Sequence, residues 1–401
     1  MSGQRAVEAD AVSAADRRRM WPLYAAGFTT AFGAHGIAAN LGAGGASLVR
    51  SVLYLGVLLA LYDGAEVVLK PVFGTLADRV GARPVLVGGL IGFAAASAVF
   101  VVIRDPGWLW AARLGQGAAA SAFSPAASAL VARLNPRAKH GRAFGSYGFY
   151  KSIGYTAGPL LGGLLVWAGG LRLLFAVLTL LAGAIAVWAV LAVPAVPPLP
   201  KNRQTLLDLA RRLADHTFLR PVAALAAATA ALSVGVGFLP RSGAAAGLSP
   251  VATGAAVSVL AACAAIVQPM AGRALDSGQL TTRSGLVAGL SATACGLAAA
   301  ALPGVVGLLI AAVLIGAGTG VITPLGFATL ATTTAEERMG QTMGAAELGR
   351  ELGDAGGPLF VAAIAAAATL TWGYAALALL TALLPIALAT RRKPRLTQAN
   401  S

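Results

Sequence analysis

The sequence contains an internal repeat in which glycines and prolines recur at one constant offset of 199 residues. The matched pairs are Gly117 and Gly316, Pro125 and Pro324, Gly141 and Gly340, Gly145 and Gly344, Gly154 and Gly353, Gly158 and Gly357, and Pro159 and Pro358. In water, helices with these residues would fray, because glycine and proline are the two worst helix formers. In a membrane both are tolerated, since glycine lets helices approach closely and neighbouring helices satisfy the groups that proline leaves open. The repeat predicts two copies of one membrane unit.

The composition also lies outside the range of soluble globular domains, because 57% of the 401 residues are hydrophobic and only 11% are charged. Apolar stretches of about 20 residues, long enough to cross the hydrocarbon core of a bilayer, recur along the chain. Twelve predicted spans result: 21–42, 50–73, 84–103, 107–132, 142–168, 171–193, 220–239, 250–271, 284–303, 304–332, 341–369 and 371–390. We therefore expect an all-α membrane protein with 12 transmembrane helices in two pseudo-symmetric six-helix bundles.

A proline-rich stretch divides these spans into two sets of six. Residues 194–200 read PAVPPLP, and proline removes backbone donors, so the stretch is expected to leave the bilayer in extended form. The predicted domains are an N-terminal bundle at 1–193, a cytoplasmic linker at 194–219 and a C-terminal bundle at 220–401. The linker is either a solvated connection or an amphipathic helix on the membrane surface.

The basic residues are distributed unevenly, although the net charge is +15. If the N-terminus is cytoplasmic, and residues at the first two positions of a span are counted with the adjoining loop, 22 of the 30 Lys and Arg residues lie on the cytoplasmic side, four outside and four within the spans. This is the positive-inside pattern. It predicts a multi-pass protein of the cell inner (cytoplasmic) membrane with both termini cytoplasmic, and it favours lipid over nucleic acid as the partner of the basic runs.

Ionisable residues inside the spans are costly to bury, so each is a functional candidate. They concentrate in four spans: Asp63, Glu66 and Lys70; Arg113; Lys151; and Glu347, Arg350, Glu351 and Asp354. Within 50–73 and within 341–369, the spacing places the charges on one face of a helix. Lys151 and Arg350 also differ by 199, so the repeat keeps a cation at the same depth.

Two interpretations of these charges stay open. In the first, acids and bases neutralise one another and hold helices together. In the second, one of the five carboxylates cannot be neutralised by the four bases and binds a proton, as a proton-coupled carrier requires. The candidates for proton coupling are Asp63, Glu66, Arg113, Glu347, Glu351 and Asp354.

The segment after the second predicted span resembles the signature loop of the major facilitator superfamily. Residues 74–83 read GTLADRVGAR, and the resemblance implies a gating loop at Gly74, Asp78, Arg79, Gly81 and Arg83. Asp78 is an acceptor for Arg79, for Arg83 or for the positive N-terminal end of a neighbouring helix. Alternatively, the two arginines only set the topology. A weaker echo, GRALDSG at 272–278, departs from the pattern after its aspartate.

Two further motifs carry the resemblance. RLGQG at 113–117 is similar to the superfamily's helix-four motif, whose arginine is associated with proton coupling. The glycine helix resembles the motif of the 12-helix drug/proton antiporter subgroup, at Gly145, Gly154, Gly158, Pro159, Gly162 and Gly163. The resemblance implies a central cavity that alternates between inward and outward openings, with the spans 50–73 and 341–369 packed together.

The candidates for substrate binding are polar residues expected near that cavity: His35, Asn40, Tyr150, Lys151 and Arg350. Histidine titrates near neutral pH, and tyrosine would provide an aromatic wall for a lipophilic ligand. Packing against a neighbouring helix is the alternative for each uncharged residue.

These features predict a secondary transporter that exports a small lipophilic compound in exchange for protons, and the resemblance implies that it works as a monomer. The alternative is an exporter or uniporter of a specific metabolite, organic anion or cation. The sequence contains no GxxxxGK[ST], HExxH or GxSxG motif, so neither an ATP-driven pump nor a common hydrolase is expected. We expect no enzymatic activity, cofactor or metal.

Overall fold

The computed structural model describes residues 2–40, 52–102, 106–196, 216–248 and 250–389. Within these residues the secondary structure is α-helical, with three short 3-10 turns and no strand. The helices are α1 (Ser2–Asn40), α2 (Val52–Val80), α3 (Ala82–Val102), α4 (Leu109–Arg133), α5 (His140–Ala192), α7 (His216–Ala245), α8 (Pro250–Asp276), α9 (Thr282–Ala300), α10 (Gly304–Thr333), α11 (Met339–Ala367) and α12 (Leu370–Ala389). Most of the predicted linker, 197–215, lies outside the described residues.

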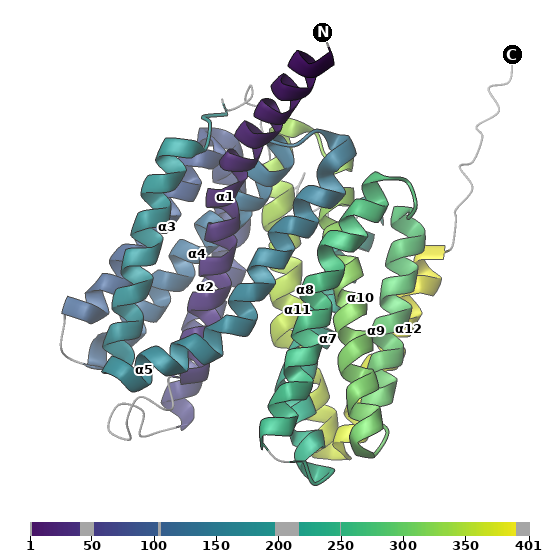
Figure 1. Cartoon of the computed structure of the whole chain (residues 1–401). Coiled ribbons are helices and arrows are strands. Elements are labelled where there is room, and N and C mark those ends of the chain that lie inside the picture. The colour runs from purple at the N-terminus through teal and green to yellow at the C-terminus, as the bar shows by residue number, and fades with distance from the viewer. Residues whose placement is uncertain (1, 41–51, 103–105, 197–215, 249, 390–401) are drawn as a thin grey trace, which may run out of the picture.

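The described residues form eleven separate α-helices, and the prediction of twelve differs from this count at α5. This helix contains both predicted spans 142–168 and 171–193, with non-helical backbone between them at Gly169 and Gly170. Gly170 has a φ of +70°, a left-handed conformation that glycine adopts at little cost. In Figure 1 the chain changes direction at this break, so one continuous helix assignment covers two differently directed segments.

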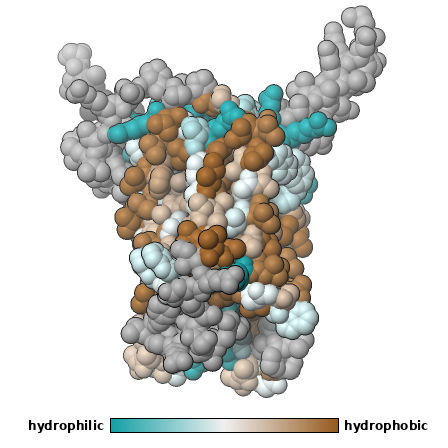
Figure 2. Space-filling view, turned by 90° about the vertical axis from the view of Figure 1, so that its left-hand side faces the viewer, coloured by the Kyte–Doolittle hydropathy of each residue, from teal (hydrophilic) through white to brown (hydrophobic). Residues whose placement is uncertain are grey.

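Five helical segments of the described residues are long and apolar enough to cross a membrane. They are Ala82–Val102, Arg137–Ala192, Phe218–Ala245, Gly254–Asp276 and Gly304–Thr333. These are fewer than the twelve predicted spans. Helices α2 and α11 are not among them, and both carry several charged residues within their apolar sequence. Figure 2 shows hydrophobic residues across the middle of one face and hydrophilic residues collected at its upper end.

All six tryptophans of the chain are exposed on its surface, and several stand beside helix ends. Trp108 and Trp110 flank the start of α4, Trp372 follows the start of α12, and Trp167 precedes the break in α5. Tryptophan is enriched where a membrane protein meets the interface between lipid and water. Their placement is typical of residues that anchor helix ends at that interface.

The helices form two groups, α1–α5 and α7–α12, which correspond in sequence to the two predicted bundles. The C-terminal parts of the glycine motif bring helices of the same group into close contact. A Cβ atom on Gly158 would lie 3.0 Å from the backbone nitrogen of Gly36 in α1. In the second repeat, a Cβ atom on Gly357 would lie 2.7 Å from the Cα of Ala230 in α7. The repeat therefore packs α5 on α1 and α11 on α7 in the same way.

The N-terminal parts of the same two helices contact the other group of helices. A Cβ atom on Gly145 would lie 2.6 Å from the carbonyl oxygen of Gln268 in α8, and one on Gly344 would lie 2.7 Å from that of Lys70 in α2. Figure 1 shows α1–α5 on the left and α7–α12 mostly on the right. Each glycine-bearing helix thus packs partly within its own group and partly across the interface.

We expect Gly353→Ala to destabilise the protein. The added Cβ would overlap the backbone of Ala226 in α7, and such overpacking lowers the free energy of unfolding by about 1–3 kcal/mol. Gly356→Ala in the same helix is the matched control, because nothing lies within 4 Å of its added Cβ and alanine is the better helix former. Thermal unfolding in detergent should show a lower Tm for Gly353→Ala alone; equal Tm values would contradict the close contact.

Candidate functional site

The residues predicted as a gating loop are mostly helical. α2 continues through Val80, and Gly81, with a φ of +100°, forms the turn into α3 at Ala82. The prediction of a loop from residue 74 was therefore wrong. Asp78 therefore lies on the last turns of α2, beside α11. The two helices are in close contact here, since a Cβ atom on Gly74 of α2 would lie 2.5 Å from the carbonyl oxygen of Gly340 in α11.

Asp78 binds the first turn of α11. Its carboxylate accepts hydrogen bonds from the backbone N–H groups of Gly340, at 2.6 Å, and Gln341, at 2.8 Å. The N-terminus of a helix carries unpaired N–H groups and a partial positive charge, so it favours a carboxylate. Arg79 is exposed, and the Arg83 guanidinium donates to the carbonyl of Val190. Of the three acceptor roles considered for Asp78, the structure shows the one at a helix terminus.

The second repeat makes the same contact. Asp276, at the end of α8, accepts hydrogen bonds from the backbone N–H groups of Gly141 and Arg142, both at 2.8 Å, in the first turn of α5. The sequence echo at 272–278 departs from the signature only after this aspartate, so the acceptor itself is kept. Two carboxylates therefore tie α2 to α11 and α8 to α5.

Lys70 joins two carboxylates across the interface between the groups of helices. Its Nζ lies 3.0 Å from Oε2 of Glu66 in its own helix and 2.5 Å from Oε1 of Glu351 in α11. Tyr62 donates a hydrogen bond of 3.4 Å to the other oxygen of Glu66. Lys70 and Glu66 are buried, so the group is shielded from water and its charges depend on one another.

Glu347 forms a second buried group with the opposite stoichiometry. Its Oε2 lies 3.2 Å from Nζ of Lys151 in α5 and 3.4 Å from a guanidinium nitrogen of Arg350, one turn further along α11. Ser128 of α4 donates to Oε1 at 3.4 Å. One acid therefore serves two bases here, whereas at Lys70 one base serves two acids.

The remaining candidates for proton coupling lie around these two groups. The Arg113 guanidinium is buried 4.3 Å from the centre of the Tyr62 ring and donates to Gln116 at 3.4 Å. Asp63 is exposed and Asp354 is half-buried. Among the described residues, neither aspartate has a basic group within 4.0 Å.

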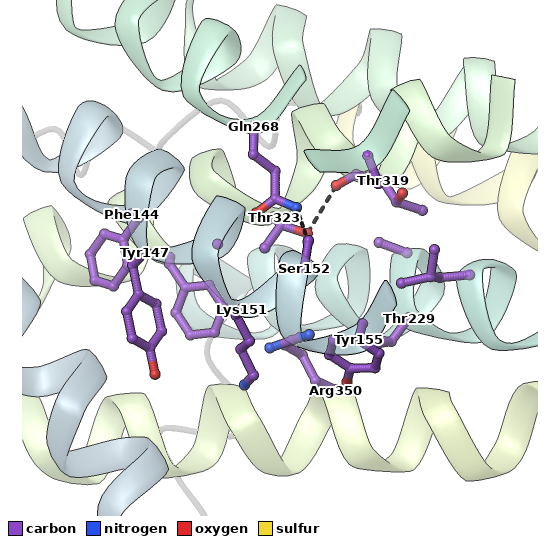
Figure 3. Close-up of a pocket in the computed structure, with 15 residues that line it drawn as sticks. Phe144, Tyr147, Lys151, Ser152, Tyr155, Thr229, Gln268, Thr319, Thr323 and Arg350 are labelled. Carbon is purple, nitrogen blue, oxygen red and sulfur yellow. Dashed lines mark hydrogen bonds between the residues drawn. The ribbon is translucent and has the colours of Figure 1, made fainter. Parts of the chain in front are cut away.

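A pocket lies between the two groups of helices. It is lined from both sides, by Phe144, Tyr147, Gly148, Lys151, Ser152, Tyr155, Ala228, Thr229, Leu232, Ala264, Gln268, Thr319, Thr323, Phe327 and Arg350. Figure 3 shows Lys151, Tyr155 and Arg350 beside one another, on the side opposite Gln268. The cavity volume of about 30 Å³ is enough for ordered water and too small for an organic compound. An organic compound would fit only if the helices around the pocket moved apart.

The five candidates for substrate binding separate in the structure. Lys151 and Arg350 line the pocket. His35 packs on the Tyr155 ring, with centroids 4.0 Å apart, and Tyr150 stacks on Tyr24 at 5.0 Å. Asn40 donates to the carbonyls of Gly36 and Pro159, where α1 crosses α5. None of these three side chains is among the residues that line the pocket, although His35 contacts it through Tyr155.

Sequence reasoning missed the polar residues on the opposite wall of the pocket. The Gln268 side chain of α8 donates a 2.7 Å hydrogen bond to Ser152 of α5 across the interface. Thr319 and Thr323 stand one turn apart on α10. A single amide in the apolar sequence 250–271 was the available signal, because a buried amide needs a partner.

The chain belongs to the Major Facilitator Superfamily, whose sequence profile matches residues 20–241 and 222–401. It is accordingly a membrane protein of a family of transporters.

Curated relatives include several resistance proteins. The chain is 42% identical over 93 residues to the puromycin resistance protein pur8 of Streptomyces alboniger, covering 23% of this chain and 18% of that protein. It is 34% identical over 120 residues to the multidrug resistance protein MdtH of Cronobacter sakazakii, covering 30% of each. It is 36% identical over 112 residues to the class C tetracycline resistance protein of Escherichia coli, covering 28% of each. Each match spans less than a third of the relative's length.

Solved structures show the same fold over almost the whole chain. The human organic anion transporter MFSD10 (TETRAN) is 18% identical, with a TM-score of 0.78 over 93% of this chain and 99% of that one. The transporter FucP in the outward conformation is 14% identical, with a TM-score of 0.75 over the same shares. At these identities the likeness concerns the fold alone.

We expect Asp78→Ala to release the first turn of α11. Hydrogen bonds to a charged acceptor contribute about 1.5–3 kcal/mol, so the Gly340 and Gln341 amides should exchange with deuterium roughly tenfold faster or more. Asp276→Ala should have the corresponding effect on Gly141 and Arg142.

Each of these two variants is the control for the other in hydrogen–deuterium exchange measured by mass spectrometry. Exchange that is unchanged at the helix start facing the substituted aspartate would contradict the two contacts.

Proposed function

We propose that this chain is a proton-coupled exporter that moves a small lipophilic compound outward in exchange for protons, by alternating access. It works as a monomer in the cell inner membrane, with both termini cytoplasmic. Its twelve spans form two six-helix bundles, 1–193 and 220–401, joined by the linker 194–219, and the two segments of α5 count as two spans.

The observation that carries this proposal is the pair of buried ion-pair groups that cross the interface. Lys70 and Glu351 join α2 to α11, and Lys151 and Glu347 join α5 to α11. Protonating either carboxylate removes an attraction between the two bundles, and protonating Glu347 also leaves Lys151 and Arg350 without their shared counter-ion. Proton binding is thereby linked to the relative position of the bundles.

The closed pocket and the two aspartate contacts complete this cycle. The pocket lies at the interface and is too small for a substrate, so the surrounding helices must move apart to admit one, and alternating access has them do so on one side at a time. On the side where Asp78 and Asp276 bind the starts of α11 and α5, opening breaks four hydrogen bonds to backbone N–H groups. These groups can return to water when the contact breaks, which keeps the cost of opening moderate.

The printed names of the relatives support export of a toxic compound. Three of them are resistance proteins, one for puromycin, one for tetracycline and one for multiple drugs. The glycine motif, which resembles that of drug/proton antiporters, supports exchange for protons. The polar residues of the pocket lie among aromatic rings and aliphatic side chains, as expected for an amphipathic ligand.

We expect Glu351→Gln and Glu347→Gln to reduce substrate-dependent proton movement at least tenfold, because a carboxamide does not gain or lose a net proton near neutral pH. The measurement uses the purified protein in liposomes that contain a pH-sensitive dye, with a panel of lipophilic cations, neutral drugs and organic anions. Glu336→Gln is the control, since Glu336 is an exposed carboxylate in the turn before α11.

Neutralising Asp63, Glu66 and Asp354 in turn completes the test. Unaltered proton movement in all five variants would contradict proton coupling through these residues. Substrate movement without protons would instead favour a uniporter of a specific metabolite.

A further inference from the structure

The ionisable groups around the pocket have an uneven distribution of sign. Lys151 and Arg350 both line it, whereas the described residues of its lining include no aspartate or glutamate. The acid that both bases share, Glu347, is fully buried behind them. The two cations therefore face the pocket while their common counter-ion does not.

The shared acid leaves much of the donor capacity of the two cations unused. Its contacts to Lys151 and Arg350, at 3.2 and 3.4 Å, are longer than the 2.7–2.9 Å typical of charge-assisted hydrogen bonds. A guanidinium has five N–H donors and an ammonium three, and one carboxylate cannot satisfy both groups. A second anionic acceptor placed in the pocket would find donors from two helices.

The walls beside these cations are aromatic. The rings of Phe144 in α5 and Phe327 in α10 stack with centroids 5.4 Å apart and an angle of 18°. The Arg350 guanidinium lies 5.9 Å from the centre of the Phe327 ring, and Tyr155 lines the same side of the pocket. When the helices separate, an aromatic body can replace the ring-to-ring contact at the place where an acidic group would meet the cations.

We propose that the transported compound is an organic anion with an aromatic body, whose acidic group binds Lys151 and Arg350 while its rings lie between Phe144 and Phe327. This inference rests on the proposed function, since it assigns the pocket to the exported substrate. A cationic drug would meet two like charges and no acid on these walls. The anion competes with Glu347 for the same two cations.

The test uses three ligands with one ring system and three charges: naphthalene-2-carboxylate, its carboxamide and the corresponding naphthylmethylamine. Isothermal titration with the purified full-length protein should give a Kd for the carboxylate at least about tenfold lower than for the amide, and no binding of the amine. The proposal would be overturned if the unsubstituted protein bound the amide or the amine as tightly as it binds the carboxylate.

Variants then locate the site. Lys151→Gln and Arg350→Gln should lose the preference for the carboxylate, whereas Arg241→Gln, which removes an exposed arginine at the end of α7, should keep it. Glu347→Gln should bind the carboxylate more tightly, because both cations lose their internal competitor. Weaker binding by Glu347→Gln would contradict this competition.

The liposome assay separates this inference from the proposed function. Proton movement driven by the amide or amine and not by the carboxylate would overturn the anion site and leave proton-coupled export standing. Tight carboxylate binding that depends on Lys151 and Arg350, without proton movement for any of the three ligands, would support the site and contradict proton-coupled export.

Discussion

A charge buried in an apolar medium must be neutralised, and in this protein that requirement is met across the interface between its two groups of helices. α11 supplies Glu347, Arg350 and Glu351, while α2 and α5 supply Lys70 and Lys151. Each ion-pair group has unequal numbers of acids and bases, so binding of a proton or an anion would change its charge balance. In the proposed transport cycle, the contacts that hold the helices together are the ones that respond to this change.

Glycine makes these contacts possible, because ion pairs of about 3 Å need helices that approach closely. Gly145 and Gly344 bring α5 to α8 and α11 to α2, at positions that the repeat relates by 199 residues. At the starts of α5 and α11, Asp276 and Asp78 add a pair of matching hydrogen-bonded contacts. Helices α5 and α11 thus each contact helices of both groups. This position suits them to pass a change at the ion pairs from one group of helices to the other.

Much of this arrangement follows from sequence signals of fixed period. The repeat, the apolar lengths and the spacing of Glu347 and Glu351 predict helices, their pseudo-symmetry and a charged face. The pairing of Lys70 with Glu351 depends on how α2 and α11 cross. These two residues are 281 positions apart in the sequence, so no local pattern predicts their contact. For the same reason the sequence did not show that Asn40 and Tyr150 turn toward neighbouring helices, or that Gln268 reaches Ser152. The helix count differs at Gly169 and Gly170, where two non-helical glycines change the direction of the chain without a loop.

The most direct measurement is the distance between spin labels at Val80 and Gln279, exposed positions at the end of α2 and after α8, in a background without Cys263 and Cys295. We expect a longer distance to become populated at acid pH in the otherwise unsubstituted protein. Glu351→Gln should show the same longer distance at neutral pH, because both conditions remove the attraction to Lys70. Distance distributions that are identical in all three cases would contradict the claim that the buried ion pairs couple protons to movement of the helices.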